Sequence, residues 1–80
     1  TISFIEVAAG RALPRHKQIH QQYTFVLEGQ FELTVNDVPQ VLDPGMYALI
    51  PSETYHSGIA VTDCKLLDVF SPVREDYRKL

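Results

Sequence analysis

The sequence predicts an all-β fold built from short strands, arranged as a sandwich or a barrel. Apolar and polar residues alternate along residues 2–7 and again along residues 31–36, which is the period of a half-buried strand. Residues that favour turns separate the apolar runs at short spacing; they are Ala9-Gly10, Glu28-Gly29, Asn36-Asp37, Asp43-Pro44-Gly45 and Pro51-Ser52. The one helical segment that we expect is short, polar and terminal, at residues 75–80.

Each expected strand ends where the chain meets a turn residue. Residues 16–22 read as a strand that continues into the apolar run 23–27, and Glu28-Gly29 ends it. Residues 46–50 form a short strand that Pro51 terminates, and residues 52–55 turn the chain so that His56 begins the next strand. In the last expected strand Asp68 and Phe70 share one face, because side chains two positions apart point the same way.

Composition limits the functional classes. Eighty residues predict one domain over residues 1–80, and a chain that starts at Thr1 leaves open whether N-terminal strands precede it. A net charge of −3 without a basic stripe argues against nucleic acid as a partner, and no apolar run is long enough to cross a bilayer. The single cysteine, Cys64, permits no internal disulfide; we expect it to be a buried small hydrophobe, and a reducing, cytoplasmic location is the default.

A run of imidazoles and carboxamides is the best indication of function. In a strand, His16, Gln18, His20 and Gln22 would all point to one face. His56, placed just after a turn, can face inward at the mouth of a barrel and meet them. The opposite face of the same strand, Tyr23, Phe25 and Leu27, is apolar, so we expect it to be covered by a second copy in a homodimer.

The spacing of these residues resembles that of the cupin superfamily, whose fold is a double-stranded β-helix, or jelly-roll barrel. The first cupin motif is glycine, five residues, His-x-His, three or four residues, Glu, six residues, glycine. Gly10, His16-Lys17-Gln18, Gln22 and Gly29 keep those intervals. The second motif, glycine, five residues, Pro-x-Gly, two residues, His, corresponds to Gly45, Pro51-Ser52-Glu53 and His56. The resemblance covers residues 10–56.

The departures from the motifs affect the residues expected to bind a metal. Gln18 stands for the second histidine, Gln22 for the glutamate and Glu53 for the motif's glycine. The resemblance implies a divalent metal (Ni, Zn, Fe or Mn) held by His16, Gln18, Gln22 and His56. Neutral amide oxygens would hold it weakly. Two alternatives stay open: His20 replaces the missing imidazole, or a register shifted by one residue puts Arg15 and Lys17 in the histidine positions to hold an anionic ligand directly.

The tail resembles that of small cupins named pectin degradation (KdgF-type) proteins. Residues 67–77, Leu-Asp-Val-Phe-Ser-Pro-Val-Arg-Glu-Asp-Tyr, match their D-x-F-x-P-x-R-x-D pattern. The resemblance implies ring opening of 4,5-unsaturated uronic acid monomers to linear keto acids. It makes Asp68 and Arg74 catalytic, with Arg74 also the clamp for the sugar carboxylate and Phe70 a wall of the pocket. His20 is a further candidate for substrate binding.

Structural roles compete with each of these assignments. His16 and His20 can be surface residues, Gln18 and Gln22 can hydrogen-bond in a polar cavity, and Arg74 can pair with Glu75 or Asp76. Asp68 can be a strand-edge carboxylate paired with Lys65. Three functional classes follow: a metal-assisted enzyme acting on an anionic sugar acid, a non-catalytic small-molecule sensor or binding module, and a metal-dependent dioxygenase or isomerase.

Overall fold

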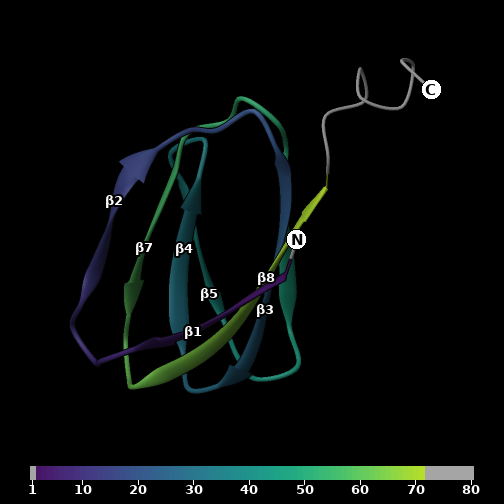
Figure 1. The fold of residues 1–80 in the computed structure, drawn as a ribbon. Helices are drawn as coiled ribbons and strands as arrows, with labels where there is room; N and C mark the ends of the chain where they lie inside the picture. The colour runs from purple at the N-terminus through teal and green to yellow at the C-terminus, as the bar shows by residue number, and fades with distance from the viewer. Residues whose placement is uncertain (1, 72–80) are drawn as a thin grey trace.

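The computed structural model describes residues 2–71, and the helix expected at residues 75–80 lies outside them. The described chain folds into strands connected by short turns (Figure 1). The strands are β1 (Ile2–Val7), β2 (Ala12–His16), β3 (Gln21–Glu28), β4 (Phe31–Val35), β5 (Val38–Leu42), β6 (Tyr47–Ile50), β7 (His56–Ala60) and β8 (Cys64–Ser71). No helix long and apolar enough to cross a lipid bilayer occurs among residues 2–71.

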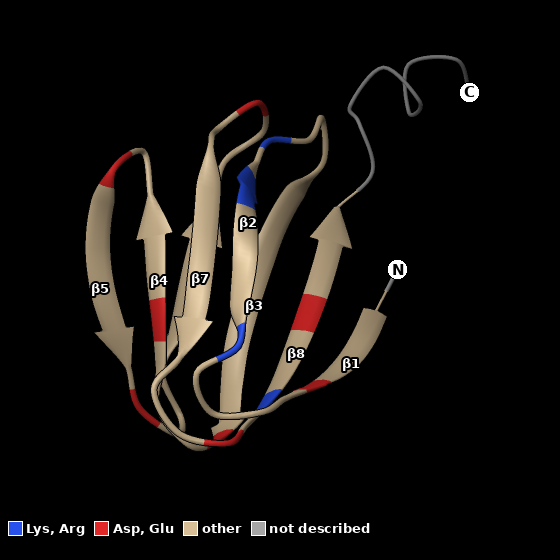
Figure 2. Ribbon diagram, turned by 90° about the vertical axis from the view of Figure 1, so that its left-hand side faces the viewer, with Lys and Arg blue, Asp and Glu red and all other residues tan. Residues whose placement is uncertain are grey.

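The strands form two antiparallel four-stranded sheets, in the orders β1-β8-β3-β6 and β2-β7-β4-β5. The two sheets face each other as a flattened barrel in Figures 1 and 2, and consecutive strands often lie in different sheets. This is the predicted all-β jelly roll. The turn expected at Asn36-Asp37 is a tight connection between β4 and β5, in which both residues have positive φ (52° and 67°).

The side chains between the sheets change from apolar to polar along the strands. The apolar core lies between the inner faces of the two sheets and consists of Val7, Val26, Phe31, Leu33, Leu42, Ile50, Ala60, Cys64 and Leu66. Further along the same inner faces, β3 continues from Val26 to Thr24 and Gln22, and β8 continues from Leu66 to Asp68. In Figure 2 most charged segments lie at strand ends or turns, whereas acidic segments lie within β4 and β8. The barrel is therefore packed with hydrocarbon at one end and lined with polar groups at the other.

One predicted strand was wrong. The chain leaves the sheet after His16, and residues 17–20 form an irregular connection before β3 begins at Gln21. The connection is fixed from outside: the backbone N–H of Glu53 donates to the Gln18 carbonyl (2.8 Å), and the Ser52 hydroxyl donates to the Ile19 carbonyl. These two bonds join the segments that carry the two predicted motifs, so the turn before His56 is attached to the loop that follows His16.

Glu53 occupies the position of the second motif's glycine and keeps a glycine-like backbone, with φ at 62°. An L-residue in this left-handed region costs roughly 1–2 kcal/mol. Its backbone N–H nevertheless donates a hydrogen bond to the Gln18 carbonyl, so the turn keeps its shape without the glycine.

Replacing Glu53 by glycine should therefore stabilise the protein. We expect Glu53→Gly to raise the free energy of unfolding by about 0.5–1 kcal/mol, after allowing for the extra freedom of glycine in the unfolded chain. Urea unfolding measures the difference, and Glu53→Ala, which keeps a Cβ, is the matched control and should show no such gain. A Glu53→Gly variant less stable than Glu53→Ala would contradict this account of the turn.

The outer face of the β1-β8-β3-β6 sheet carries two adjacent apolar rows. The strand register places its side chains in two cross-strand rows, Ile2–Val69–Tyr23–Leu49 and Phe4–Leu67–Phe25–Tyr47. Phe4 and Tyr47 are 57% and 59% exposed, and neither row contains a charged residue. On the other sheet, by contrast, Glu32 and Thr34 interrupt the outer face.

We propose that a second copy of the chain covers this face. An uncharged apolar surface is complementary to itself, as the two-fold symmetric interface of a homodimer requires. Its four most exposed side chains, Ile2, Phe4, Tyr47 and Leu49, alone present on the order of 500 Å², and a patch of this size is often a functional surface. A dimer would bury these rows sheet against sheet without burying a charge.

Light scattering at tens of micromolar should give twice the 9.1 kDa chain mass. Tyr47→Lys puts a charge into one row, at its β6 end, and should give a monomer, because pairing would bury that charge. Val38→Lys is the control: Val38 is 66% exposed on β5 of the other sheet, and this variant should remain dimeric. A monomeric wild-type protein, or a dimer unaffected by Tyr47→Lys, would refute the proposal.

Candidate functional site

The polar end of the barrel encloses a cavity of about 260 Å³. Its polar lining comes from four strands and one loop and comprises His16, Gln18, Gln22, Thr24, His56, Ser57 and Asp68. Apolar side chains close its base and walls; they include Leu13, Phe31, Leu33, Ile50, Leu66 and Phe70. A cavity with an apolar body and a few converging polar groups is typical of a small-molecule site.

Two histidines meet at this cavity because β2 pairs with β7. His16 lies directly opposite His56 in the register, and their ring centroids are 4.2 Å apart with the rings tilted by 59°. A register shift between Leu13 and His16 interrupts the ladder on β2 just before this pair. The two rings thus come from separate motifs and from separate turns of the chain.

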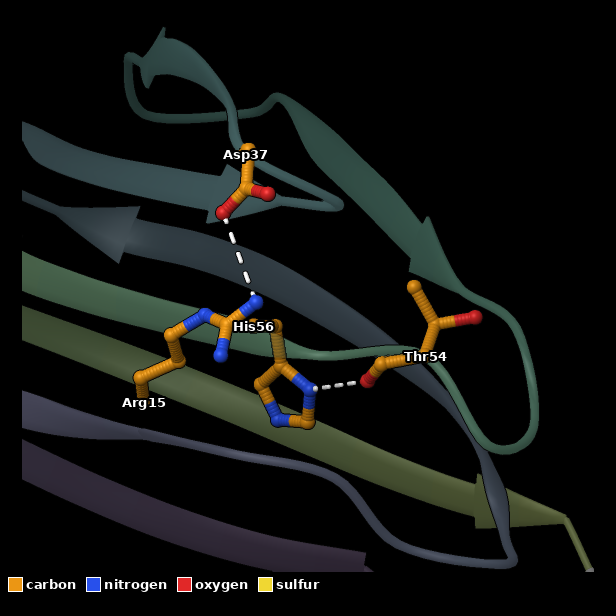
Figure 3. A network of polar contacts seen from close by, with 4 residues as sticks. All are labelled: Arg15, Asp37, Thr54 and His56. Carbon is orange, nitrogen blue, oxygen red and sulfur yellow. Dashed lines mark hydrogen bonds and ion pairs between the residues drawn. The ribbon is translucent and has the colours of Figure 1, made fainter.

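Backbone carbonyls orient both imidazoles. The Nδ1 of His16 lies 2.9 Å from the Pro14 carbonyl oxygen, and the Nδ1 of His56 lies 3.1 Å from that of Thr54, a contact drawn in Figure 3. A carbonyl only accepts, so each Nδ1 must carry the proton, which leaves the lone pair of each neutral ring on Nε2. Burial lowers the pKa of His56, and so does the nearby His16. The hydrogen bond to the Thr54 carbonyl and the charge of Asp68 raise it. His56 therefore favours the neutral form that binds metals.

A chain of three hydrogen bonds crosses the cavity wall. The Gln18 Nε2 donates to Gln22 Oε1 (2.6 Å), the Gln22 Nε2 donates to Thr24 Oγ1 (2.9 Å), and the Thr24 hydroxyl donates to Asp68 Oδ1 (2.9 Å). Strand pairing places the last two residues directly opposite each other on β3 and β8. The chain leads from the loop at the mouth to a buried carboxyl group.

Asp68 is 8% exposed, and among residues 2–71 no lysine or arginine lines its cavity. Burial raises the pKa of its carboxyl group, whereas hydrogen bonds from Thr24 and Gln22 and the charge of His56 lower it. The alternative of a strand-edge carboxylate paired with Lys65 is wrong, because Lys65 instead pairs with Glu28 at 2.9 Å. A buried carboxyl beside a cavity is suited to holding and releasing a proton.

The structure brings together six of the residues predicted for the site. His16, Gln18, Gln22, His56, Asp68 and Phe70 all line the one cavity. Arg74, predicted as the carboxylate clamp, lies outside the described residues. The metal, catalytic and substrate roles of all these residues remain predictions.

His20 is not part of this cavity. The placement of His20 on one face with His16 was wrong, because the chain turns between them instead of continuing as a strand. His20 is partly buried outside the cavity lining, and its buried Nδ1 has no hydrogen-bond partner. It therefore does not replace the missing imidazole beside His56.

The shifted register was also wrong. Arg15 and Lys17 lie against the Tyr55 ring, with the Arg15 guanidinium carbon 4.1 Å and the Lys17 Nζ 5.1 Å from its centroid. Arg15 also pairs with Asp37 at 3.6 Å (Figure 3). Both cations thus lie outside the cavity. The residues at the two histidine positions of the motif, His16 and Gln18, line it.

Thr24 is a site residue that the sequence-based prediction missed. It stands inside the apolar run 23–27 and reads there as an ordinary strand residue. Its position two residues after Gln22 could have predicted it, since residues two apart in a strand face the same side of β3.

The donor atoms at the mouth fit a divalent cation, but weakly. Among residues 2–71 no group of three or more His, Cys, Asp and Glu side chains could hold a metal ion. The mouth instead offers the Nε2 atoms of His16 and His56 together with the amide oxygens of Gln18 and Gln22. Imidazole suits Ni, Zn and Fe, and the neutral amides add little charge to hold the ion.

A two-sheet β-barrel with histidines from two separate motifs at its mouth defines the cupin class of proteins. The chain belongs to the Cupin_2 family, because the model of that family, described as a cupin domain, matches residues 3–70. No curated protein matches the chain.

Solved structures show the same fold. KdgF from Halomonas sp. is similar with a TM-score of 0.86 and 28% identity, over 95% of this chain and 71% of that chain. An RmlC-like cupin from Shewanella frigidimarina is similar with a TM-score of 0.81 and 31% identity, over 95% of this chain and 70% of that chain. Salicylate 1,2-dioxygenase from Pseudoaminobacter salicylatoxidans, at 22% identity and a TM-score of 0.83 over 86% of this chain and 19% of that chain, shares the fold.

Nickel titration followed by calorimetry tests the metal site. We expect Ni²⁺ to bind the wild-type protein and His56→Ala to weaken binding by at least about tenfold, since even an outer-shell change commonly costs 10- to 100-fold. His20→Ala is the matched control and should leave the affinity unchanged, because His20 lies outside the cavity. Equal losses in the two variants would show that the ion binds elsewhere.

Proposed function

We propose that this cupin acts on a small sugar acid, opening the ring of 4,5-unsaturated uronate monomers to give linear keto acids. The observation that carries the proposal is a buried carboxyl, Asp68, in the same cavity as the oriented pair His16 and His56. The likeness to KdgF from Halomonas sp., together with the matching tail pattern of residues 67–77, supports this substrate class.

The reaction is an isomerisation and needs no co-reactant. The anomeric hydroxyl loses its proton as the bond between C1 and the ring oxygen breaks, giving an aldehyde and an enolate whose charge is on the former ring oxygen. C4 of the enolate then gains a proton while C5 becomes the ketone. Each substrate molecule therefore requires one proton to leave oxygen and one to reach carbon, which is work for a general acid–base group.

Asp68 suits that work by its position and surroundings. Its carboxyl is buried, and Thr24 holds Oδ1 so that the group faces the cavity in a defined orientation. Burial raises the pKa of Asp68 towards values at which a carboxyl can both hold and return a proton. Phe70, two residues along the same face of β8, would form a wall against the sugar ring.

A divalent cation and Arg74 complete the proposal. His16, His56 and the amide oxygen of Gln22 would hold the cation, which would polarise a substrate oxygen as a Lewis acid. Arg74 would pair its planar guanidinium with the uronate carboxylate. A cytoplasmic location of the reaction stays a prediction.

A specific observation also favours a non-catalytic binding module. In this cavity Gln18 and Gln22 stand where the cupin motifs have a histidine and a glutamate. The result is a polar pocket able to bind a ligand by hydrogen bonds alone. The dioxygenase alternative has the weakest support, since the likeness to salicylate 1,2-dioxygenase concerns the fold.

Incubation with the 4,5-unsaturated galacturonate monomer tests the proposed function. We expect Ni²⁺-loaded protein to consume the conjugated double bond, seen as a fall in ultraviolet absorbance, and Asp68→Asn to lower kcat by about 100-fold or more. Asp63→Asn is the control. The Asp63 carboxylate accepts a hydrogen bond from the Ala9 N–H and does not line the cavity, so its replacement should leave kcat unchanged. Unchanged absorbance together with a ligand-dependent rise in thermal stability would instead support the binding module.

A further inference from the structure

Thr24 stands at the boundary between the apolar core and the polar mouth. It is 2% exposed, its oxygen accepts from Gln22 Nε2, and its proton goes to Asp68 Oδ1, each at 2.9 Å. The residues on its two sides have a proposed chemical role, whereas the motifs that predicted the site include no residue at position 24. Both of its hydrogen bonds are buried, so neither can be replaced by bulk water at no cost.

These bonds decide which end of Gln22 faces the mouth. A carboxamide can be turned over, which exchanges its oxygen and its NH₂ group. The Thr24 hydroxyl has one proton, and while it donates that proton to Asp68 its oxygen can only accept from Gln22. The NH₂ group of Gln22 must then face Thr24, which turns the carbonyl oxygen towards Gln18 Nε2 at the mouth, 2.6 Å away.

We propose that Thr24 is a positioning residue: it turns the Gln22 oxygen towards the mouth and holds the Asp68 carboxyl in the cavity wall. An oxygen facing the mouth can bind a cation or a substrate hydroxyl, whereas an NH₂ group in the same place would repel a cation. The proposal rests on the proposed function for the identity of the substrate, but the orientation of Gln22 does not depend on it.

Three replacements of Thr24 separate hydrogen bonding from packing. Thr24→Val keeps the branched shape that suits a strand and removes the hydroxyl. Thr24→Ser keeps the hydroxyl and removes the methyl group. Thr24→Ala removes the hydroxyl without placing a methyl group beside Asp68, and serves if Thr24→Val does not fold.

The first measurement is nuclear magnetic resonance of the Gln22 side-chain NH₂ group, assigned by its loss in Gln22→Glu. In Thr24→Val the NH₂ protons should exchange with solvent at least about tenfold faster, because their buried acceptor is gone. In Thr24→Ser the rate should stay close to that of the wild type. Urea unfolding of each variant confirms that the exchange is measured on folded protein.

The second measurement is Ni²⁺ affinity by calorimetry, and the third is turnover of the unsaturated galacturonate monomer. Thr24→Val should weaken Ni²⁺ binding by about tenfold, the usual effect of an outer-shell partner, and lower kcat more than it raises KM. Thr24→Ser should restore most of both. Unchanged NH₂ exchange and Ni²⁺ affinity in Thr24→Val would overturn the proposal, and so would a Thr24→Ser variant as impaired as Thr24→Val.

The outcome for Thr24 can be told apart from the outcome for the proposed function. If NH₂ exchange and Ni²⁺ affinity change as expected while the wild-type protein yields no keto acid, the positioning role stands and the proposed reaction fails. If the wild-type protein is active and Thr24→Val leaves all three measurements unchanged, the reaction stands and the positioning role fails.

Discussion

The pairing of β3 with β8 is the constraint on which the rest of the structure depends. Its register sets Thr24 opposite Asp68 and Gln22 opposite Phe70, and continues to Val26 opposite Leu66 in the core. One pair of strands thus supplies part of the apolar core and three polar side chains of the cavity wall, Gln22, Thr24 and Asp68. A slip of one residue would turn every inward side chain outward, exchanging this wall for the apolar side chains Tyr23 and Phe25. Folding and the candidate site therefore require the same register.

The second determinant is the mouth, where loops and not strand periodicity place the side chains. Strand alternation and turn residues were enough to predict a barrel, and the motif spacing predicted that His16 and His56 would be neighbours. Alternation cannot show where a strand ends, so the strand through residues 16–22 and the place of His20 were wrong. The loop at residues 17–20 is fixed by bonds from Ser52 and the Glu53 backbone, which are tertiary contacts beyond the reach of a local pattern. Thr24 was missed for a related reason, since its role exists only once β8 brings Asp68 opposite.

The chemistry of the site follows from replacing charged ligands by amides. Gln18 and Gln22 bring no negative charge to the mouth, and the one buried carboxyl, among the described residues that line the cavity, is Asp68 on the far side of Thr24. A cation held by His16 and His56 would therefore be bound through neutral donors, leaving the carboxyl to handle protons. This division is consistent with a site that polarises a sugar oxygen and moves a proton. It also explains why the hydrogen-bond chain matters: it connects the neutral donors to the charged group.

The central claim is that a sugar acid occupies the cavity between the two histidines and Asp68. A crystal structure of the Asp68→Asn variant soaked with the 4,5-unsaturated galacturonate monomer tests it most directly. The account predicts density for the sugar inside the barrel mouth, with its ring against Phe70 and an oxygen within hydrogen-bond distance of residue 68. A sugar bound only on the outer surface, or a mouth that stays free of sugar at saturating concentration, would contradict it.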